Sequence, residues 1–395
     1  MKVNRRIFLK YSSLAAVTPA IYQPLNETEF RVAIIGHTGR GNYGHGMDTL
    51  WKETPCCRIV AVADPVADGL NKAQQRLGVE KGYSDYRQML KETKPDIVSI
   101  APRHIDQHFD MIMAAMESGV KGLYVEKPFC RDLSEARQIV EICRHKGVKL
   151  ALAHRNRYHP ALRAAQNLIA EGRIGRVMEV RGRGKEDHRG GALDLWVLGS
   201  HVLNLVPQFT GRFTSCSAIM LQDKRPVGRA DLSAGDEGVG LVGGNRLHAR
   251  FDTESGIPFY FDSIRNAGVK EGNFGFQVLG NQGVIDVRID TEPFIHYLPV
   301  NPFYPAQSAT AWQPVSSGGV GVPEPVKSIV SDIAGHQAAA RDLMEAIREN
   351  RLTLCNEMEG YATIEAIMAV FESHRRGGEQ VKMPLEVWDN PLSRL

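Results

Sequence analysis

The sequence predicts an α/β fold of two domains: an N-terminal doubly wound parallel sheet, followed by an α+β domain with an open, mostly antiparallel sheet. Apolar, β-branched runs alternate with helix-compatible stretches from residue 31 to about residue 153, as they do in successive βαβ units. Beyond residue 154, apolar and polar residues alternate within shorter runs, which is typical of half-buried antiparallel strands. A chain of 395 residues is also longer than one ordinary domain. We therefore expect domains at 30–153 and 154–395.

Five short apolar runs form the predicted parallel sheet. Their sequences are RVAIIG (31–36), RIVAVADP (58–65), PDIVSIAP (95–102), GLYVEKP (122–128) and VKLALAH (148–154). Helix-compatible stretches follow each of the first four runs, after Gly36 and within 67–77, 106–119 and 132–147. Repeated strand–helix units imply right-handed crossovers. This order of units is that of a doubly wound nucleotide-binding domain.

The second half of the chain begins with a predicted helix at 161–172 and continues as strands. The predicted strands are MEVRGRG (178–184), RFTSCSAIM (212–220), NRLHARFDT (245–253), PFYFDSIR (258–265) and FQVLGNQGVIDVRI (276–289). Gly280–Gly283 in the last run is an evident hairpin turn. The Pro-, Gly- and Ser-rich segment 299–327 is predicted to be a long surface loop. Two amphipathic helices, around Leu343 and Ile367, close the chain.

The composition excludes several classes of function. The net charge is +3, of which residues 1–30 contribute +2, so the rest of the chain is almost neutral. A nearly neutral body argues against a nucleic-acid partner, since phosphate binding needs a clustered basic surface. No run reaches the ~20 apolar residues that span a bilayer, so no integral membrane span is predicted in the mature form. The six cysteines form no C-x-x-C pair and no zinc-site spacing, so no metal is predicted. Whether two of these cysteines form a disulfide is left open.

The N-terminus, NRRIFLKYSSLAAVTPAIY (4–22), resembles a twin-arginine (Tat) export signal, whose usual form is S/T-R-R-x-F-L-K. Asn4 replaces the favoured hydroxyl residue, while the twin arginines at 5 and 6 and the Phe-Leu-Lys at 8–10 fit. We predict that residues 1–29 are a leader and that the protein is exported to the periplasm. An accidental basic tail on a cytoplasmic protein is the alternative.

The segment RVAIIGHTGRGNYGHG, residues 31–46, predicts a phosphate-binding turn. It holds a literal G-x-G-x-x-G at Gly39–Gly44, but the apolar run already ends at Gly36. We therefore predict that the working register starts at Gly36, which makes the tight turn, that Gly41 lets the next helix pack on the sheet, and that the literal match is coincidental. In this register Thr38 approaches the phosphates and offers its hydroxyl, while the pyrophosphate lies at the N-terminus of that helix.

The second predicted strand ends at Asp64, 28 residues after Gly36. A carboxylate at this position accepts hydrogen bonds from the hydroxyls of an adenosine ribose and repels a 2′-phosphate. No arginine follows Asp64 directly, so NAD is favoured and NADP is the less favoured alternative. The strand, the glycines, the helix and the strand-terminal acid in this order predict a dinucleotide site, which the glycines alone would not.

Glu126-Lys127-Pro128, at the end of a predicted strand, resembles the E-K-P motif of the glucose–fructose oxidoreductase / inositol dehydrogenase / MocA (Gfo/Idh/MocA) family. The resemblance extends over about residues 31–385, through HRNRYHPAL (154–162), EGRIGRVMEV (171–180), GGALDLWVLGSHVLNL (190–205) and SHRRGGEQVKMPL (373–385). Family members join a Rossmann domain to an α/β domain whose open sheet often forms an oligomer interface. They use NAD or NADP to oxidise or reduce sugars, cyclitols and similar polyols. The resemblance thus implies a carbohydrate substrate and a homo-oligomer, a dimer or tetramer.

The resemblance also implies site residues. Lys127 would lie between nicotinamide and substrate, where its ammonium hydrogen-bonds the reacting oxygen and stabilises the negative charge that develops there. His201 matches the family's pocket histidine and suits a general base, because imidazole titrates near neutrality. Together with the glycine turn, the predicted cofactor-binding residues are Gly36, Thr38, Gly39, Arg40, Gly41, Asp64, Pro102, Arg103, Glu126 and Lys127. The predicted substrate-binding residues are Arg157, Asn156, Lys185, His188 and Trp196.

The helix that carries His201 departs from the family's D-x-x-x-H pattern, because Val197 stands where the aspartate is expected. Asp194 lies seven residues before His201, two turns along the same helical face. We predict that Asp194 is a catalytic residue that reaches His201 through a non-helical segment at Gly199; a helix-capping acid and a core histidine are the alternatives. The polar segment GKEDHRGGALDL (184–195) is predicted to contact a hydroxylated ligand, with a solvated charge run as the alternative.

These observations predict a nicotinamide-dependent oxidoreductase that acts on a sugar, glycoside or cyclitol hydroxyl. Because a periplasm offers no steady NAD pool, an exported enzyme of this kind is expected to hold its cofactor tightly. One alternative is a redox-neutral cycle that oxidises one sugar and reduces another, or that oxidises a glycoside, cleaves it and reduces the product. Another is a non-catalytic NAD-binding sensor or assembly protein, which the missing aspartate at Val197 keeps open.

Overall fold

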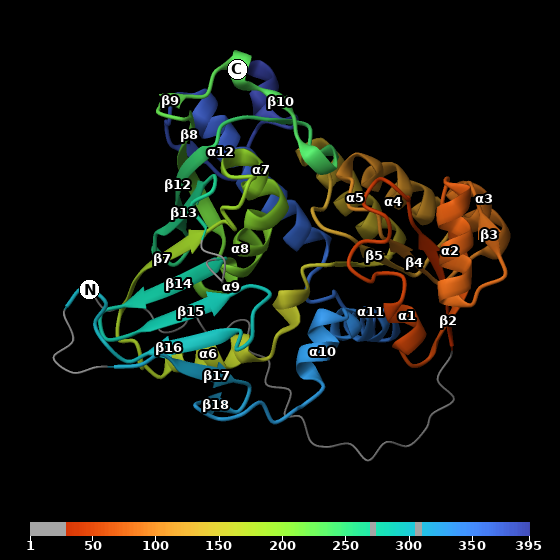
Figure 1. The fold of residues 1–395 in the computed structure, drawn as a ribbon, viewed down its shortest axis with the longest axis horizontal. Coiled ribbons are helices and arrows are strands. Elements are labelled where there is room, and N and C mark those ends of the chain that lie inside the picture. Colours follow the sequence, from red (N-terminus) through yellow and green to blue (C-terminus); the bar gives the residue numbers. More distant parts are fainter. Residues whose placement is uncertain (1–28, 269–273, 305–309) are drawn as a thin grey trace.

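The computed structural model describes residues 29–268, 274–304 and 310–395. The chain forms two domains that lie side by side, one around a parallel sheet and one around a large mixed sheet (Figure 1). This arrangement confirms the predicted fold class. The predicted leader, 1–29, lies outside the described residues except for its last residue. Within the described ranges, no helix has the length and the apolar character needed to cross a bilayer.

The N-terminal sheet consists of parallel strands. They are β1 (Phe30–Ile35), β2 (Cys57–Ala63), β3 (Gly82–Tyr83), β4 (Ile97–Ile100), β5 (Gly122–Val125) and β6 (Lys149–Leu152). Their order in space is β3-β2-β1-β4-β5-β6. The chain winds outwards from β1 to β3 and then from β4 to β6, so the carboxyl ends of β1 and β4 form the switch point at which open α/β sheets bind ligands.

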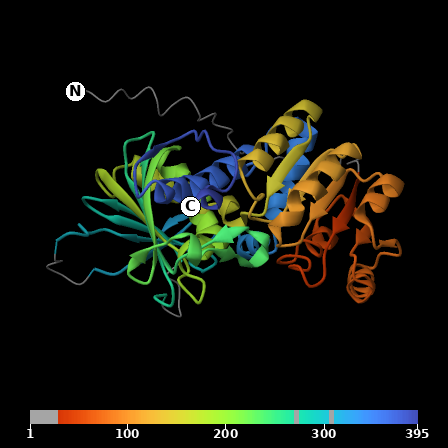
Figure 2. The ribbon, with the colours of Figure 1, turned by 90° about the horizontal axis from the view of Figure 1, so that it is seen from above.

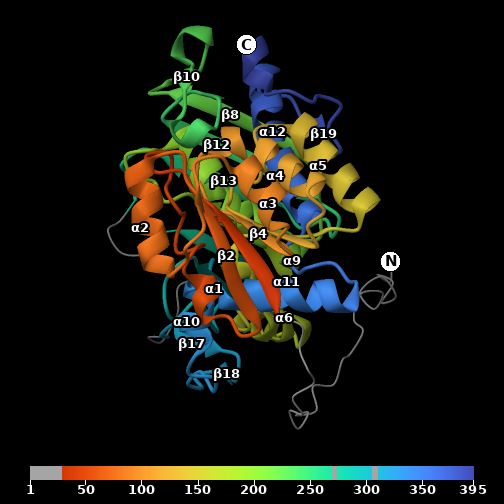
Figure 3. The same ribbon diagram turned by 90° about the vertical axis from the view of Figure 1, so that its right-hand side faces the viewer.

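Helices cover both faces of this sheet, because its central strands are apolar on both sides. The helices on one face are α3 (Tyr86–Thr93), α4 (His108–Glu117) and α5 (Leu133–Lys146). Those on the other face are α1 (Leu50–Glu53), α2 (Ala67–Leu77) and α11 (Gln337–Glu349). Figure 3 shows α11 lying beside the parallel sheet, although it comes from far beyond residue 154. The second half of the chain therefore completes the packing of the first.

The C-terminal sheet is mixed. Its strands are β7 (Val177–Arg183), β8 (Phe213–Gln222), β9 (Arg225–Pro226), β12 (Arg246–Thr253), β13 (Phe259–Ile264), β14 (Gly275–Gly280), β15 (Val284–Arg288), β16 (Ile295–Leu298), β17 (Gln313–Ser316), β18 (Gly319–Val320) and β19 (Val381–Lys382). The pair β7–β13 is parallel, while the other described pairs of this sheet are antiparallel. The predicted surface loop 299–327 is wrong in part, because the short strands β17 and β18 lie within it. Pro and Gly are unusual inside strands, so their presence here did not indicate a strand.

Helices cover one face of this sheet (Figure 2). They are α6 (Ala161–Ala170), α7 (Gly191–Asp194), a π-helix (Leu195–Gly199), α8 (Ser200–Leu205), α9 (Pro207–Thr210) and α12 (Glu357–Arg375). Buried and exposed side chains alternate along β12, so the opposite face is accessible to solvent. A short α10 (Ile329–Ala334) precedes α11.

Helix α12 joins the two domains, because it packs on β8 of the large sheet and on α5 of the parallel one. Gly360 allows this close approach: a side chain there would place its Cβ 2.5 Å from Cδ1 of Leu152 at the end of β6. The carboxyl ends of β5 and β6 consequently lie near α8. The functional groups described below gather at this junction.

Candidate active site

The glycine-rich segment after β1 forms a series of turns. Gly39, Gly41, Gly44 and Gly46 all have left-handed φ values, of 85°, 86°, 59° and 86°. Helix α1 begins only at Leu50 and has four residues. The prediction of a helix whose N-terminus receives the pyrophosphate directly after the glycines is therefore wrong, since repeated positive φ angles break a helix. An anion bound here would meet the amides of a loop instead.

Close packing decides which glycines this loop requires. A Cβ on Gly36 would lie 2.2 Å from the ring of Tyr43, and one on Gly41 would lie 2.3 Å from the backbone nitrogen of Arg103. A Cβ on Gly44 would lie 2.9 Å from a carbonyl oxygen just after β4. The missing side chain of Gly41 thus makes room for the loop that follows β4. The predicted reason for this glycine was different, namely the packing of the next helix on the sheet. Gly44 is required as well, so the packing of this loop depends on the last glycine of the literal motif at Gly39–Gly44.

Thr38 and Asp64 hydrogen-bond to each other. The Thr38 amide and hydroxyl lie 3.0 and 2.7 Å from Oδ2 of Asp64, and the amide of Val66 donates to Oδ1 at 2.9 Å. Asp64 is fully buried. These hydrogen bonds tie the glycine turn to the end of β2, and the contacts of Thr38 with a phosphate and of Asp64 with a ribose stay predictions.

A cavity of about 240 Å³ lies at the carboxyl ends of β1, β2 and β3. Its lining includes Gly36, His37, Pro65, Tyr86, Gln107 and Met111. His37 is held by a 2.9 Å contact between its Nδ1 and Nε2 of Gln107. A mostly apolar cavity beside the glycine loop suits a flat heteroaromatic ring such as adenine. Apart from Gly36, these lining residues leave no local pattern in the sequence, because they come from four separate loops.

Several buried polar atoms around the glycine loop have no hydrogen-bond partner among the described residues. They are Nε of Arg40, Nε of Arg103, Oδ1 of Asp106, Oε2 of Glu237 and both carboxyl oxygens of Glu126. Such atoms cost free energy when they are buried alone, so we expect a polar ligand to satisfy them. The phosphates of a dinucleotide accept hydrogen bonds from guanidinium groups, and its ribose hydroxyls donate to carboxylates. The residues present therefore fit a nicotinamide dinucleotide.

The loop after β4 carries two more predicted cofactor residues. Pro102 is buried, and its carbonyl oxygen lies 2.7 Å from Nε2 of His108. Nδ1 of His108 lies 3.1 Å from the carbonyl oxygen of Phe129, so this imidazole joins the loops that follow β4 and β5. Arg103 borders the glycine loop through its backbone, while Arg40 forms an ion pair with Asp106 in the same loop.

Glu126 and Lys127 follow β5 directly and are both buried, with exposed fractions of 1% and 6%. Burial raises the pKa of Glu126 to about 7, although the charge of Lys127 opposes this shift. The Lys127 ammonium donates a hydrogen bond to the backbone carbonyl of Val197, 3.0 Å away in the π-helix of the other domain. The predicted catalytic lysine thus lies at the junction of the cofactor domain and the C-terminal domain.

His201 lies in α8 next to this lysine and is 5% exposed. Its Nδ1 lies 3.5 Å from Nδ1 of His154, which follows β6. The ring of Phe274 meets the imidazole edge-on at 5.9 Å. Burial, and then the charge of Lys127, lower the pKa of His201 well below its usual range. The imidazole is consequently neutral near pH 7, and a neutral imidazole can accept a proton.

Arg155 and Asp290 form an ion pair beside His201. Arg155 donates from Nε and NH2 to Oδ1 of Asp290 at 3.3 and 2.9 Å, and Asn156 donates to the same oxygen at 3.1 Å. The positive charge of Arg155 contributes to the lowered pKa of His201, after burial and Lys127. The structure therefore brings Asn156 close to the site. Neither Arg155 nor Asp290 was singled out from the sequence, although Arg155 lies within the quoted motif at 154–162.

Two more histidines were missed. His336, just before α11, is 2% exposed, and its Nδ1 lies 2.5 Å from the hydroxyl of Tyr124. Burial, and then Arg155, lower the pKa of His336 to about 3. His45 belongs to the glycine loop, and burial together with the charge of Lys127 lowers its pKa. In the described part of the chain, no three His, Cys, Asp or Glu side chains are arranged to hold a metal ion.

Asp194 does not reach His201. Its carboxylate accepts hydrogen bonds from the amides of Lys185 and Glu186 at 3.2 and 3.1 Å and from the Ser263 hydroxyl at 2.6 Å. Asp194 is fully buried, and the chain between Asp194 and His201 is helical throughout. The predicted catalytic role of Asp194 is corrected: this carboxylate fixes the loop at 184–186 against β13.

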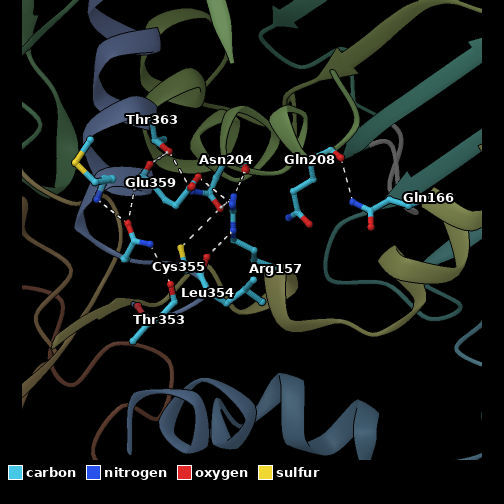
Figure 4. A network of polar contacts seen from close by, with 11 residues as sticks. Arg157, Gln166, Asn204, Gln208, Thr353, Leu354, Cys355, Glu359 and Thr363 are labelled. Atoms are coloured by element: carbon cyan, nitrogen blue, oxygen red, sulfur yellow. Dashed lines mark hydrogen bonds and ion pairs between the residues drawn. The ribbon is translucent and has the colours of Figure 1, made fainter. Parts of the chain in front are cut away.

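Arg157 and Trp196 are interior residues, which corrects their predicted contact with substrate. The Arg157 guanidinium donates to the carbonyl of Leu354 at 3.0 Å and to that of Asn204 at 2.6 Å, and it pairs with Glu359 at 2.9 Å (Figure 4). Through these contacts the Arg157 side chain joins α8 to Leu354 and to the first turn of α12. Trp196 is fully buried and packs near Phe371.

Lys185 and His188 lie on the loop that follows β7. Both are exposed, and His188 contacts Asp187 at 3.6 Å. Among the described residues, no hydrogen bond or ion pair joins either side chain to Lys127 or His201. Their contact with a substrate therefore stays a prediction.

Residues 30–154 match the family model described as oxidoreductase family, NAD-binding Rossmann fold. Levoglucosan dehydrogenase of Pseudarthrobacter phenanthrenivorans is 25% identical over 260 residues, which cover 58% of this chain and 64% of that protein. The scyllo-inositol 2-dehydrogenase (NAD(+)) of Bacillus subtilis is 31% identical over 156 residues, 40% of this chain and 44% of that protein. The chain thus matches less than two thirds of the length of either relative.

Solved structures share the fold over nearly the whole chain. A levoglucosan dehydrogenase in complex with NADH and L-sorbose has a TM-score of 0.69 and 20% sequence identity, and it covers 90% of this chain and 99% of its own. An oxidoreductase from Kribbella flavida has a TM-score of 0.70 and 18% identity, and it covers 91% of this chain. The solved structures thus show a shared fold, and the family model shows that residues 30–154 are similar to the NAD-binding Rossmann domains of this oxidoreductase family.

Proposed function

We propose that this protein is an NAD-dependent oxidoreductase that acts on a hydroxyl of a sugar, glycoside or cyclitol. The observation that carries the proposal is the meeting of Lys127, at the end of β5 in the NAD-binding domain, with the helix that bears the neutral base His201. An ammonium and a neutral imidazole at one place provide an electrostatic stabiliser and a proton acceptor for alcohol oxidation.

Each residue has a distinct part in this proposal. Bound NAD supplies the hydride acceptor, and the chain supplies orientation and electrostatics. Lys127 hydrogen-bonds the substrate oxygen and stabilises the negative charge that develops on it. His201 accepts the hydroxyl proton on Nε2, since its Nδ1 faces His154. Arg155 and Asp290, already paired, offer polar groups to the neighbouring hydroxyls of a polyol.

The carbohydrate class rests on the relatives, whose names specify levoglucosan and scyllo-inositol as compounds on which they act. Both compounds are polyhydroxylated rings. The polar groups around His201 are compatible with such a ring, because hydroxyls both donate and accept hydrogen bonds.

Tight retention of the cofactor is a further part of the proposal. The segment around Glu237, between β10 (Ser233–Ala234) and β11 (Leu241–Val242), reaches across to the NAD-binding domain. Oε1 of Glu237 lies 3.8 Å from NH1 of Arg103, and a Cβ on Gly238 would lie 2.4 Å from Oδ1 of Asp106. This segment of the C-terminal domain covers the loop that follows β4. Such a cover slows the exit of a ligand bound beneath it.

A redox-neutral cycle is the second candidate. A retained cofactor that is reduced by one sugar and reoxidised by another needs no free NAD pool, which suits the periplasmic location that we propose from the twin arginines at 5 and 6. The contact between Glu237 and Arg103 supports retention of the cofactor, which the redox-neutral cycle requires and which is also compatible with a simple dehydrogenase.

The test is mass spectrometry of the nicotinamide that copurifies with the full chain, followed by a panel of sugars, glycosides and cyclitols monitored at 340 nm. We expect retained NAD(H) and reduction of the cofactor by at least one polyol. If the protein retains NAD(H) and forms new sugar products without net absorbance change, the redox-neutral cycle is supported instead. Retained NAD(H) without any hydride transfer would leave a non-catalytic sensor as the better account.

A further inference from the structure

His154 and His201 form a buried pair of imidazoles at the domain junction. Their Nδ1 atoms lie 3.5 Å apart, and the rings are nearly perpendicular, with an interplanar angle of 89° and centroids 5.1 Å apart. His154 is 2% exposed and His201 5%. Two Nδ1 atoms this close are favourable only when one carries a hydrogen and the other presents a lone pair.

The surroundings keep this pair neutral. The charged or titratable groups that act on His201 are Lys127, Arg155, His45 and His336, and those that act on His154 are His201, Lys127 and Arg157. Burial, and then these neighbours, lower the pKa values of both histidines well below their usual range. The nearby carboxylate of Asp290 is already bound by Arg155 and Asn156. The pair therefore shares one Nδ1 hydrogen, and its position decides which nitrogen of His201 is basic.

We propose that His154 is the positioning residue for His201: its Nδ1 accepts the Nδ1 hydrogen of His201, which leaves the lone pair of His201 on Nε2. This inference rests on the proposed function, in which that lone pair receives the hydroxyl proton. An acid at 197, the position that the family pattern assigns to aspartate, would fix the same tautomer, but the Val197 side chain has no acceptor and Asp194 is bound elsewhere. A neutral imidazole replaces the carboxylate.

The pair also gives the proton a second place to go. When the substrate O–H bond breaks, the proton forms an N–H bond at Nε2 of His201; bound NAD+ would be the oxidant that takes up the hydride of the adjacent C–H bond. The Nδ1 hydrogen of His201 can then move to Nδ1 of His154, so that the positive charge lies on His154. The substrate alcohol becomes a carbonyl group, and each proton and electron pair is accounted for.

The first test is nitrogen NMR of the histidines in the full wild-type chain, with His201 assigned by comparison with His201→Asn. We expect the His201 signals of a neutral ring with hydrogen on Nδ1 and a free lone pair on Nε2. A ring with hydrogen on Nε2 would overturn the proposal, whether or not the protein oxidises any sugar. This readout separates the inference from the proposed function.

The second test compares two variants of His154. His154→Phe keeps a ring of similar size but removes the acceptor, whereas Oδ1 of asparagine in His154→Asn replaces Nδ1 as an acceptor. We expect kcat of His154→Phe to fall about 100-fold with little change in KM, together with a shift of the His201 tautomer. His154→Asn should retain the wild-type tautomer and most of the turnover. The exposed His145→Asn serves as control, and a wild-type tautomer in His154→Phe would overturn the proposal.

Discussion

The Lys127 ammonium donates its hydrogen bond to the backbone carbonyl of Val197, at 3.0 Å, across the junction of the two domains. A main-chain acceptor orients the lysine without adding a negative charge to the site. The Val197 side chain is itself 4% exposed and packs in the core. The site consequently combines a cation and neutral imidazoles where the family pattern leads one to expect an aspartate.

An acid restored at position 197 should therefore change how His201 titrates. We expect Val197→Asp to raise the pKa of His201, because a nearby carboxylate favours the protonated imidazole. Since the base must be neutral, the acid limb of the kcat–pH profile should move to higher pH. The pKa is measured by NMR titration of His201.

The neutral variant Val197→Asn is the matched control for Val197→Asp. It introduces a polar side chain of the same shape but no charge, so it should leave the pKa of His201 near the wild-type value. Equal titration of His201 in the two variants would contradict the proximity that we infer.

Removal of the Lys127 ammonium should abolish most of the turnover. In Lys127→Met the chain length is kept but the charge is lost, so we expect kcat to fall by about 10²–10³-fold. The Lys127 ammonium donates its hydrogen bond to Val197 in the C-terminal domain, so NADH affinity, followed by fluorescence titration, should change little. Lys146→Met, on an exposed lysine at the end of α5, is the control. Full activity of Lys127→Met on a substrate of the wild-type enzyme would refute the assignment.

Glu126 should make the protein less stable as the pH rises. Its pKa is about 7 in the folded chain against an ordinary value of 4.5, so between these values the unfolded state loses its proton first. Stability then decreases as the pH increases towards 7 and levels off above it. Relative to Glu126→Gln, the wild type should lose about 2 kcal/mol of unfolding free energy between pH 5 and pH 8.5.

Urea unfolding of the wild type and of Glu126→Gln at the two pH values measures this difference. The exposed Glu386→Gln provides the control, since it should follow the wild type at both pH values. Parallel pH profiles of the wild type and Glu126→Gln would show that Glu126 has an ordinary pKa in the folded protein.

The contact between Glu237 and Arg103 should slow the release of the cofactor. The pair is separated by 3.8 Å, and the exposed fractions of its side chains are 36% for Arg103 and 17% for Glu237, so its contribution is at most about 1 kcal/mol. We expect NADH to leave Glu237→Gln up to about fivefold faster than the wild type, as measured by stopped-flow fluorescence. Addition of salt should reduce the difference. Unchanged release rates at low salt would show that the segment around Glu237 does not retain the cofactor.

The parallel sheet and the position of Lys127 could be predicted because both depend on local patterns. A buried strand leaves a continuous apolar run, and its end is marked where polar residues such as Glu126 and Lys127 begin. The glycine loop was predicted less well. Its glycines are visible in the sequence, but the positive φ angles that replace the helix and the hydrogen bonds from Thr38 to Asp64 depend on the loop that follows β2.

The role of Asp194 was mispredicted for a definable reason. Residues seven apart share a face only in a regular α-helix, and here a π-helix at Leu195–Gly199 separates Asp194 from His201. The i→i+5 pattern inserts one residue, which rotates Asp194 by about 100° relative to His201. The contacts of Arg157 with Leu354 and Glu359, nearly two hundred residues further along the chain, likewise leave no local pattern that could have identified this arginine as interior.

The return of α11 to the parallel sheet has a consequence for any attempt to divide this protein. Ala339 and Leu343 belong to the same apolar cluster as residues of β1 and β5. Gly122 in β5 leaves room for Ile347 of α11, because a Cβ on Gly122 would lie 2.6 Å from Cδ1 of Ile347. A fragment cut near residue 153 would expose this surface to water. Chimeras that exchange substrate specificity between relatives must therefore transplant two separate stretches of chain, or keep the native α11 with its own sheet.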